Sequence, residues 1–366
     1  MDPAKPSLDL VRSATDEHVL RALLRYRRLT RAELATATGI SKPTAGESVR
    51  RLTERGLIAD TGERTPGGRG KGRVGTYYAL AGDVGTALVV AIAPEGVVAE
   101  TIDVYGDTAA RATRPGHPER IAAALSGAVA EAAAGHSPRL AVVSAADPVD
   151  RATGRLVHLP DAAFLVGELD PAAIIGPHVA GPVTVGNDVN WAARAERAAA
   201  PGTPDDFAYL YLGEGLGCAV VSDGAVHRGG AGLAGEIAHL VTAGSDGRAM
   251  RFVQVFAELG LHRPGTSAID TAHLLAAAAA DPAVRSTLGT AVAGAVAAVI
   301  ALADPACVIV GGPWGVPLLG DIRTAVAALP RHVPVRPTAL TSDAPLTGAR
   351  AEAVRLLQDS VIGRPA

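Results

Sequence analysis

Two stretches of the sequence place polar side chains where they could bind a small molecule. In the first, PVTVGNDVNWAARAERA (residues 182 to 198), the pattern predicts a strand that delivers Asn187 and Asp188 at its carboxyl end, followed by a helix. Ligands of α/β folds bind in the crevice at the carboxyl ends of strands, beside helix N-termini. An Asn-Asp pair is equally typical of a helix N-cap. The residues alone therefore leave a ligand site and a helix cap open.

The second stretch, YLYLGEGLGCAVVSDGAVHRGGAGLAGEIAHLV (residues 209 to 241), carries Glu236 and His239. A carboxylate and an imidazole three residues apart on one helical face are usually an exposed pair. Here they follow AGLAG in an apolar context, which favours a pocket. Together these groups can accept hydrogen bonds from a polar ligand and donate hydrogen bonds to it.

A third stretch is suited to binding phosphate. Residues 67 to 75 read GGRGKGRVG, and no acidic residue occurs from position 64 to 78. A P-loop requires Ser or Thr after its lysine, whereas glycine follows Lys71, and no strand precedes the loop to feed a phosphate-binding helix. Glycines would instead let basic side chains approach the backbone of DNA or enter a narrow minor groove. The loop residues expected to contact DNA are Arg69, Lys71 and Arg73.

The elements around this loop predict a winged helix. Residues 15 to 27 carry apolar side chains at helical spacing, and Thr30 and Glu33 form a capping box that begins a second helix. Gly39 ends that helix and Ser41 opens a third. The alternating segment TYYALAG after the basic loop predicts a strand. A helix-turn-helix followed by strand, basic loop and strand is a winged helix-turn-helix.

The second helix of a helix-turn-helix places its N-terminal residues in the major groove. The residues expected at its exposed leading face are Ser41, Lys42, Thr44 and Ser48. Arg50 and Arg51 lie further along and are expected to contact phosphate rather than bases. The alternative is a three-helix bundle in the accessory domain of an enzyme.

Charge is distributed unevenly along the chain. Residues 1 to 82 carry 15 Lys and Arg against 9 Asp and Glu, whereas residues 83 to 366 carry 19 against 28. A short basic domain fused to an acidic body favours nucleic-acid binding at the basic end. Charge alone does not distinguish this interpretation from an N-terminal domain with an ordinary solvated surface.

Composition excludes other classes of protein. A length of 366 residues suggests two or three folding units. Cys218 and Cys307 lie in apolar runs without disulfide or metal-site spacing, which indicates buried thiols in a reducing compartment. The N-terminus is too polar for a signal peptide, and the apolar run from 288 to 303 is shorter than the roughly 20 residues of a membrane span. We therefore expect a cytoplasmic, nucleoid-associated protein with no membrane partner.

From about residue 18 to residue 360 the sequence resembles the ROK family (repressor, open reading frame, kinase). The run VLRALLRYRRLTRAELATATGISKPTAGESVRRLTERGLI and the Gly/Arg-rich wing are similar to the DNA-binding domain of the family's repressors. The segments DVG, GND, GEGLG, GEIAH and DPACVIVGG are similar to motifs of its sugar kinases.

This resemblance implies an α/β fold with two domains. Residues 1 to 80 would form the winged helix-turn-helix, and residues 81 to 366 a two-lobed, ribonuclease-H-like domain of the actin/hexokinase type. The small lobe would comprise about residues 81 to 186 plus 345 to 366, and the large lobe about residues 187 to 344.

The resemblance also implies where a sugar would lie. The expected ligand-binding residues are Asn187, Asp188, Glu236, His239 and Asp161, the last in the place of a sugar-contacting Asn. In the family's kinases the residue at the position of Asp188 is the general base. The family's small-residue P-G loop is replaced here by Ala146-Asp147.

Three departures from the family pattern concern ATP and zinc. Leu88 stands where the family has a phosphate-binding Lys, and Glu214 stands where it has a Thr near the phosphates, so charge repels ATP. Gly244, Asp246, Arg251 and Val253 replace the three cysteines and the Glu of the zinc motif. His239 alone cannot form a tetrahedral zinc site. We therefore expect no ATP, no zinc and no catalytic residue.

These features predict a sequence-specific DNA-binding transcriptional regulator of carbohydrate metabolism, a repressor controlled by a sugar or sugar-derived ligand. A palindromic operator on double-stranded DNA predicts a homodimer or a dimer of dimers. Two alternatives stay open. One is an ATP-dependent sugar kinase with a DNA-binding appendage and Asp188 as base, and the other is a DNA-binding regulator with a non-sugar ligand or none.

Overall fold

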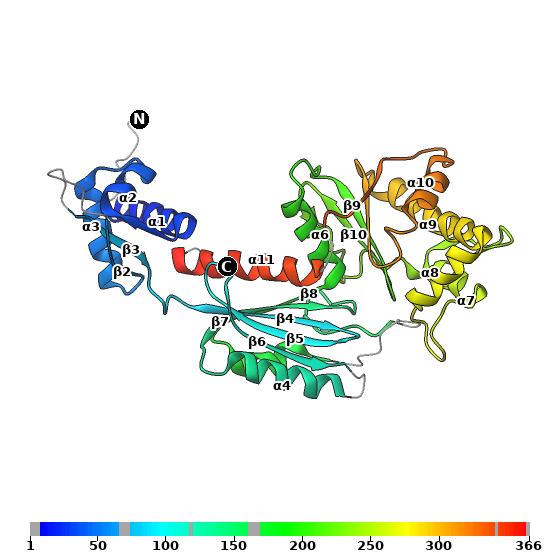
Figure 1. Ribbon diagram of the computed structural model, residues 1–366, viewed down its shortest axis with the longest axis horizontal. Helices are drawn as coiled ribbons and strands as arrows, with labels where there is room; N and C mark the ends of the chain where they lie inside the picture. The colour runs from blue at the N-terminus through cyan, green and yellow to red at the C-terminus, as the bar shows by residue number, and fades with distance from the viewer. Residues whose placement is uncertain (1–7, 66–73, 117–119, 160–168, 341–342, 364–366) are drawn as a thin grey trace.

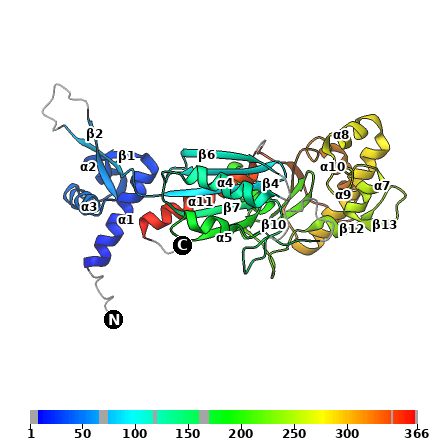
Figure 2. The same cartoon turned by 90° about the horizontal axis from the view of Figure 1, so that it is seen from below.

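The computed structural model describes residues 8–65, 74–116, 120–159, 169–340 and 343–363. It shows an N-terminal domain and two lobes, each built on its own β-sheet (Figure 1). The N-terminal domain and the second lobe lie at opposite ends of the molecule, with the first lobe between them in both views (Figures 1 and 2). The expected α/β class is confirmed.

The N-terminal domain has the expected winged helix-turn-helix fold. Its helices are α1 (Leu8–Tyr26), α2 (Arg31–Thr38) and α3 (Lys42–Glu54). Its strands β1 (Arg28–Thr30), β2 (Ile58–Arg64) and β3 (Thr76–Leu80) form an antiparallel sheet in the order β1-β3-β2. β2 and β3 lead into and out of the wing, whose residues Arg69, Lys71 and Arg73 lie outside the described residues.

Local hydrogen bonds explain where the helices of this domain begin and end. The Thr30 amide donates to the Glu33 carboxylate at 2.7 Å and the Glu33 amide donates to Thr30 Oγ1 at 3.3 Å, so the predicted capping box is confirmed. Gly39 ends α2 with a φ of 71°, which favours glycine. Ser41 begins α3 because its Oγ accepts a hydrogen bond from the Thr44 amide at 3.2 Å.

The first lobe is a five-stranded mixed sheet in the order β6-β5-β4-β7-β8. Its strands are β4 (Thr86–Ala93), β5 (Gly96–Ile102), β6 (Thr108–Pro115), β7 (Pro138–Ala145) and β8 (Val183–Asn187). Helices α4 (Ile121–Ala133) and α11 (Ala344–Ile362) cover opposite faces of this sheet (Figure 1). Alternate residues of β4 pack on the two faces, with Leu88 and Val90 in the core against α4 and Ala87 and Val89 in the core against α11. The short helix α5 (Pro171–Ile175) packs beside α4.

The second lobe repeats this plan with a sheet in the order β11-β10-β9-β14-β15. Its strands are β9 (Phe207–Leu212), β10 (Leu216–Ser222), β11 (Ala225–Val226), β14 (Val308–Gly311) and β15 (Val335–Pro337). Its helices are α6 (Asp188–Ala199), α7 (Phe252–Glu258), α8 (Thr271–Ala280), α9 (Pro282–Ala303) and α10 (Leu319–Ala327). A small hairpin, β12 (Val241–Ala243) and β13 (Ala249–Arg251), lies beside α9 and α7.

Helix α9 is long and apolar enough to cross a membrane by length and composition alone. In the fold it packs against α10 and β12, and residues such as Val292, Val296 and Ile300 are buried in the core of the second lobe. This burial agrees with its interpretation as a core helix.

The N-terminal domain packs directly on the first lobe. Leu20 and Leu23 of α1 belong to the same hydrophobic core as Leu357 of α11. Arg27 Nη1 donates to Asp107 at 2.5 Å, which links the end of α1 to the loop after β5. A continuous core and an ion pair therefore join the two units.

Candidate ligand-binding cavity and DNA-binding helix

A cavity lies where the carboxyl ends of β7 and β8 face the β9–β10 turn and residues 235 to 239. It encloses about 860 Å³ of free space, including its open mouth. This is the crevice in which α/β folds bind ligands. Its polar lining residues include Asp147, Asn187, Asp188, Tyr211, Glu214, Glu236, His239 and Ser267.

Asn187 and Asp188 join β8 to α6 and line the cavity as well. Asn187 Oδ1 accepts hydrogen bonds from the amides of Val189 at 3.0 Å and Asn190 at 3.4 Å, so it caps the helix. Asp188 Oδ1 accepts from the Val189 amide at 2.7 Å. Cap and cavity wall are therefore the same residues, and the two interpretations of the sequence do not exclude each other.

Glu236 and His239 enter the cavity from a tight turn rather than from a regular α-helix. The 3-10 helix η3 (Ile237–His239) follows Glu236 directly. Gly235 before it has a φ of 99°, and a Cβ on it would lie 1.7 Å from the Cys218 carbonyl oxygen. Only glycine allows this close approach, which brings Glu236 against β10 and into the cavity.

Arg251 lies beside His239 at the position where the resemblance implies a zinc-binding cysteine. Its Nη1 is 3.5 Å from His239 Nδ1. A guanidinium can only donate, so this contact places a hydrogen-bond donor and a positive charge beside the His239 ring. No set of three His, Cys, Asp or Glu side chains suited to a metal ion occurs in the described part of the chain. The residues of this segment therefore do not fit zinc.

Three carboxyl groups of the cavity have raised pKa values. Burial, followed by repulsion from Asp188 and Glu236, raises the pKa of Asp147 to about 7. Burial raises the pKa of Asp188 to about 7 against hydrogen bonds that lower it. Burial and then Asp188 raise the pKa of Glu236 to about 7. The cavity therefore holds a concentration of acidic groups that water solvates poorly.

Asp147 is a cavity residue that sequence reasoning left out of the ligand-binding set. It lies two residues after β7, it is 6% exposed, and its side chain lines the cavity. The signal in the sequence was the carboxyl end of a buried strand, the same signal that singled out Asn187 and Asp188. Asp161, which was expected in this site, lies outside the described residues.

Two positions at which the resemblance implies phosphate-binding side chains carry Leu88 and Glu214. Leu88 is fully buried in the core of the first lobe, so its position presents no cation. Glu214 accepts a hydrogen bond from Arg263 through Oε1, and its Oε2 is buried without a partner. Burial is the main cause that raises the pKa of Glu214. A buried carboxyl group in this turn offers no positive charge to a triphosphate.

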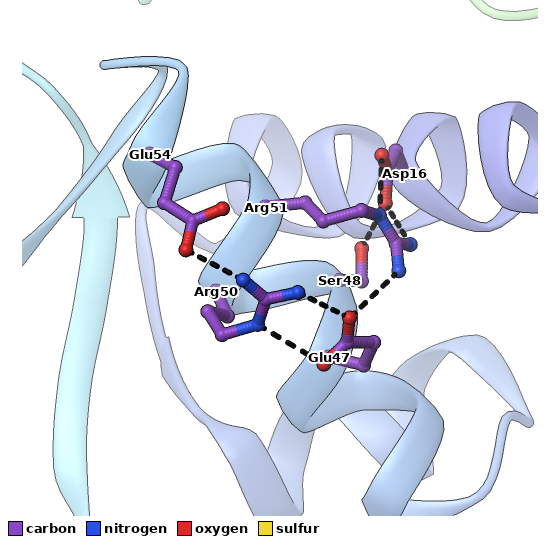
Figure 3. A network of polar contacts seen from close by, with 6 residues as sticks. All are labelled: Asp16, Glu47, Ser48, Arg50, Arg51 and Glu54. Carbon is purple, nitrogen blue, oxygen red and sulfur yellow. Dashed lines mark hydrogen bonds and ion pairs between the residues drawn. The ribbon is translucent and has the colours of Figure 1, made fainter.

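The leading end of α3 exposes three of the predicted DNA-contacting residues, namely Ser41, Lys42 and Thr44. The prediction that Ser48 belongs to this exposed face is wrong. Ser48 is fully buried and donates to Asp16 Oδ1 of α1 at 2.5 Å (Figure 3). The helix turns Ser48 toward α1, where the buried carboxylate of Asp16 needs a donor.

Arg50 and Arg51 are both engaged in ion pairs (Figure 3). Arg51 donates to Asp16 at 2.7 Å, its side chain is 22% exposed, and it belongs to the interface of α1 and α3. Arg50 is exposed and lies between Glu47 and Glu54, with N–O distances of 2.6 Å to each. The structure therefore places Arg51 in a structural contact and leaves Arg50 at the surface, neutralised by its neighbours.

Comparisons with known proteins agree with this architecture. The model of the ROK family matches residues 94–258, and the model of a winged helix-turn-helix DNA-binding domain matches residues 12–59. A crystal structure of a ROK family transcriptional regulator, a homolog of the E. coli MLC protein, superposes with a TM-score of 0.63. It covers 96% of this chain and 98% of its own at 19% identity, which shows a shared fold.

Sugar kinases are also similar to the body of the chain. A ROK family glucokinase from Streptomyces griseus in complex with glucose and AMPPNP has a TM-score of 0.56 and 25% identity over 74% of this chain and 100% of its own. The bifunctional enzyme NanE/NanK of Brucella suis biovar 1 (strain 1330) is 31% identical over 147 residues. That match spans 38% of this chain and 28% of the Brucella protein.

Proposed function

Because the chain joins a winged helix-turn-helix to a ROK family domain, we propose that it is a sequence-specific DNA-binding transcriptional regulator, a repressor, controlled by a sugar or sugar-derived ligand. The observation that supports the proposal is that one chain has both an exposed start of α3, as in a recognition helix, and a separate cavity with a polar lining. A sugar kinase without a regulatory role would need only the cavity.

The DNA-binding half of the proposal is supported by side chains and charge. Lys42 and Thr44 lie at the exposed start of α3, where a recognition helix contacts base edges. The wing, with Arg69, Lys71 and Arg73, would follow the phosphate backbone or minor groove. A protein with two-fold symmetry matches a palindromic operator, so the working form is a homodimer or a dimer of such dimers.

The ligand-binding half rests on the cavity. The side chains that can bind hydroxyl groups of a ligand are those of Asn187, Asp188, Glu236 and His239. Asp161 would be a fifth ligand-binding residue. Helix α6 begins in the cavity at Asp188, packs along α11, and α11 contacts α1 of the DNA-binding domain. A ligand that favours one arrangement of the lobes would thereby change the relative placement of the two DNA-binding domains in a dimer.

We also propose that the protein is a regulator rather than a kinase. Leu88 and Glu214 offer ATP neither a cation nor a neutral donor, although Asp188 remains at the position of a general base. Neither ATP nor zinc is part of the proposed mechanism. A protein with this function works in the cytoplasm, on the nucleoid.

Footprinting tests the proposal. Purified full-length protein should protect a palindromic site in the DNA upstream of its own gene, and a panel of sugars should change that protection. Absence of sequence-specific protection would contradict the regulatory role. A coupled assay in which any hexose drives ATP turnover, with turnover lost in Asp188→Ala, would establish the kinase instead.

A further inference from the structure

Besides Glu214, which is paired with Arg263, the cavity collects carboxyl groups from three different elements. Asp147 follows β7, Asp188 begins α6, and Glu236 precedes η3. Among the residues described, no Lys, Arg or His forms an ion pair with any of the three. Asp147 is buried, at 6% exposed, and its side chain has no hydrogen-bond partner in the described chain although it lines the cavity. Buried polar groups normally have partners, so Asp147 is left for a ligand.

The charges of the cavity exclude most classes of ligand. A phosphate or carboxylate group of a ligand would face three acidic side chains that are not paired with a cation. The resulting repulsion disfavours the binding of sugar phosphates and acidic sugars. A single metal ion is also a poor fit, because the described residues contain no group of three ligating side chains close enough to hold one. The acidic groups instead share the cavity wall with apolar residues such as Leu159, Val189 and Ile269, a mixed lining that suits an organic molecule.

We propose that the ligand carries an ammonium group together with hydroxyl groups, as an amino sugar does, and that Asp147 is the residue that selects it. This inference rests on the proposed function of the cavity. An ammonium group supplies three donors and the positive charge that Asp147 lacks. Asn187 and Asp188 also line the cavity, and we expect the hydroxyl groups of the ligand to lie beside them. The resemblance to the ROK family implies a loop of small residues at Ala146-Asp147, and this chain has the carboxylate of Asp147 there. A preference for an amino sugar would therefore distinguish this protein from kinases of neutral sugars.

Isothermal titration can test this selection with matched ligands. D-Glucosamine, D-galactosamine and D-mannosamine are each compared with the neutral hexose and with the N-acetyl derivative of the same configuration, using full-length protein. At least one amine should bind about tenfold or more tighter than both of its neutral partners, since a hydrogen bond between charged groups is stronger than one between neutral groups. In Asp147→Asn that ratio should fall to near one.

Two controls separate selection from other effects. Glu95→Gln removes an exposed carboxylate that acts on Asp188 through space without lining the cavity, and it should keep the preference for the amine. A thermal melt of Asp147→Asn confirms that the variant is folded. The inference is overturned if no amine binds better than its neutral partners, or if Asp147→Asn keeps the full ratio. Neither result would contradict the regulatory function, because the footprinting experiment tests that function independently. The regulatory function is contradicted only if the protein binds no operator.

Discussion

Asp16 of α1 and Arg51 of α3 form an ion pair, with 2.7 Å between Asp16 Oδ1 and Arg51 Nη2, that holds the recognition helix against the first helix (Figure 3). Ser48 donates to the same carboxylate from a fully buried position. One acidic side chain thus satisfies two donors from α3. The orientation of the recognition helix depends on this contact, although neither Asp16 nor Ser48 is placed to touch DNA.

Asp16→Ala is expected to destabilise the DNA-binding domain by about 2–4 kcal/mol, because it leaves Ser48 and the partly buried guanidinium of Arg51 without their partner. Chemical denaturation of the full-length protein measures the change. Arg50→Ala is the matched control on the same helix, and it should leave stability nearly unchanged because both of its ion pairs are exposed. Equal losses from the two substitutions would contradict a special role for Asp16.

Arg50 is neutralised by Glu47 and Glu54 in the absence of DNA. Replacing both with Gln should free the guanidinium for phosphate, so operator affinity should rise and the salt dependence should steepen by up to about one unit. Fluorescence anisotropy at several salt concentrations gives both quantities. Glu131→Gln, an exposed carboxylate on α4 of the first lobe, is the control and should change neither. An unchanged slope in the double variant would show that Arg50 does not reach phosphate.

The wing is expected to bind DNA phosphates through Arg69 and Lys71. Replacing both with Ala should weaken operator binding and reduce the magnitude of the salt slope by about one unit for each phosphate that the wing no longer neutralises. The same anisotropy titrations measure this. A double variant with wild-type affinity and slope would rule out the assignment of this loop to DNA.

The acidic cavity predicts a pH dependence of stability. Unfolded Asp and Glu have pKa values near 4, whereas Asp147, Asp188 and Glu236 have values of about 7 when folded. Between these values the folded state binds more protons than the unfolded state, so these groups make the free energy of unfolding fall as pH rises from about 4 to about 7. Other charged groups around them are Glu95, Glu214 with Arg263, and His239 with Arg251.

Asp147→Asn removes one of these titrating groups. The variant should be more stable than the wild-type protein at pH 8, by about 1 kcal/mol or more, and should lose less stability between pH 5.5 and pH 8. Melting curves at a series of pH values check both expectations. Asp205→Asn, at an exposed site in the second lobe, should leave the pH profile as it is. A wild-type protein whose stability rises steadily over this range, unaffected by Asp147→Asn, would contradict the prediction.

The sequence by itself determined the features that depend on near neighbours. Thr30 and Glu33 lie three residues apart, so their capping box follows from local chemistry, and the boundary at Ser41 has the same origin. Asn187 at the end of a strand pattern was recognisable both as a cap and as a cavity residue. Hydrophobic periodicity and glycine positions predicted the winged helix, because both follow from regular backbone geometry, whereas the two-lobed fold was predicted from the resemblance to the ROK family.

Only the tertiary structure decided what surrounds each side chain. Ser48 has the polarity of a DNA-reading residue, and its burial depends on Asp16, which lies 32 residues away on another helix. Asp147, Asp188 and Glu236 become one acidic cavity because three separated segments converge there. Burial and electrostatic repulsion act through distances in space, and spacing along the chain does not report those distances.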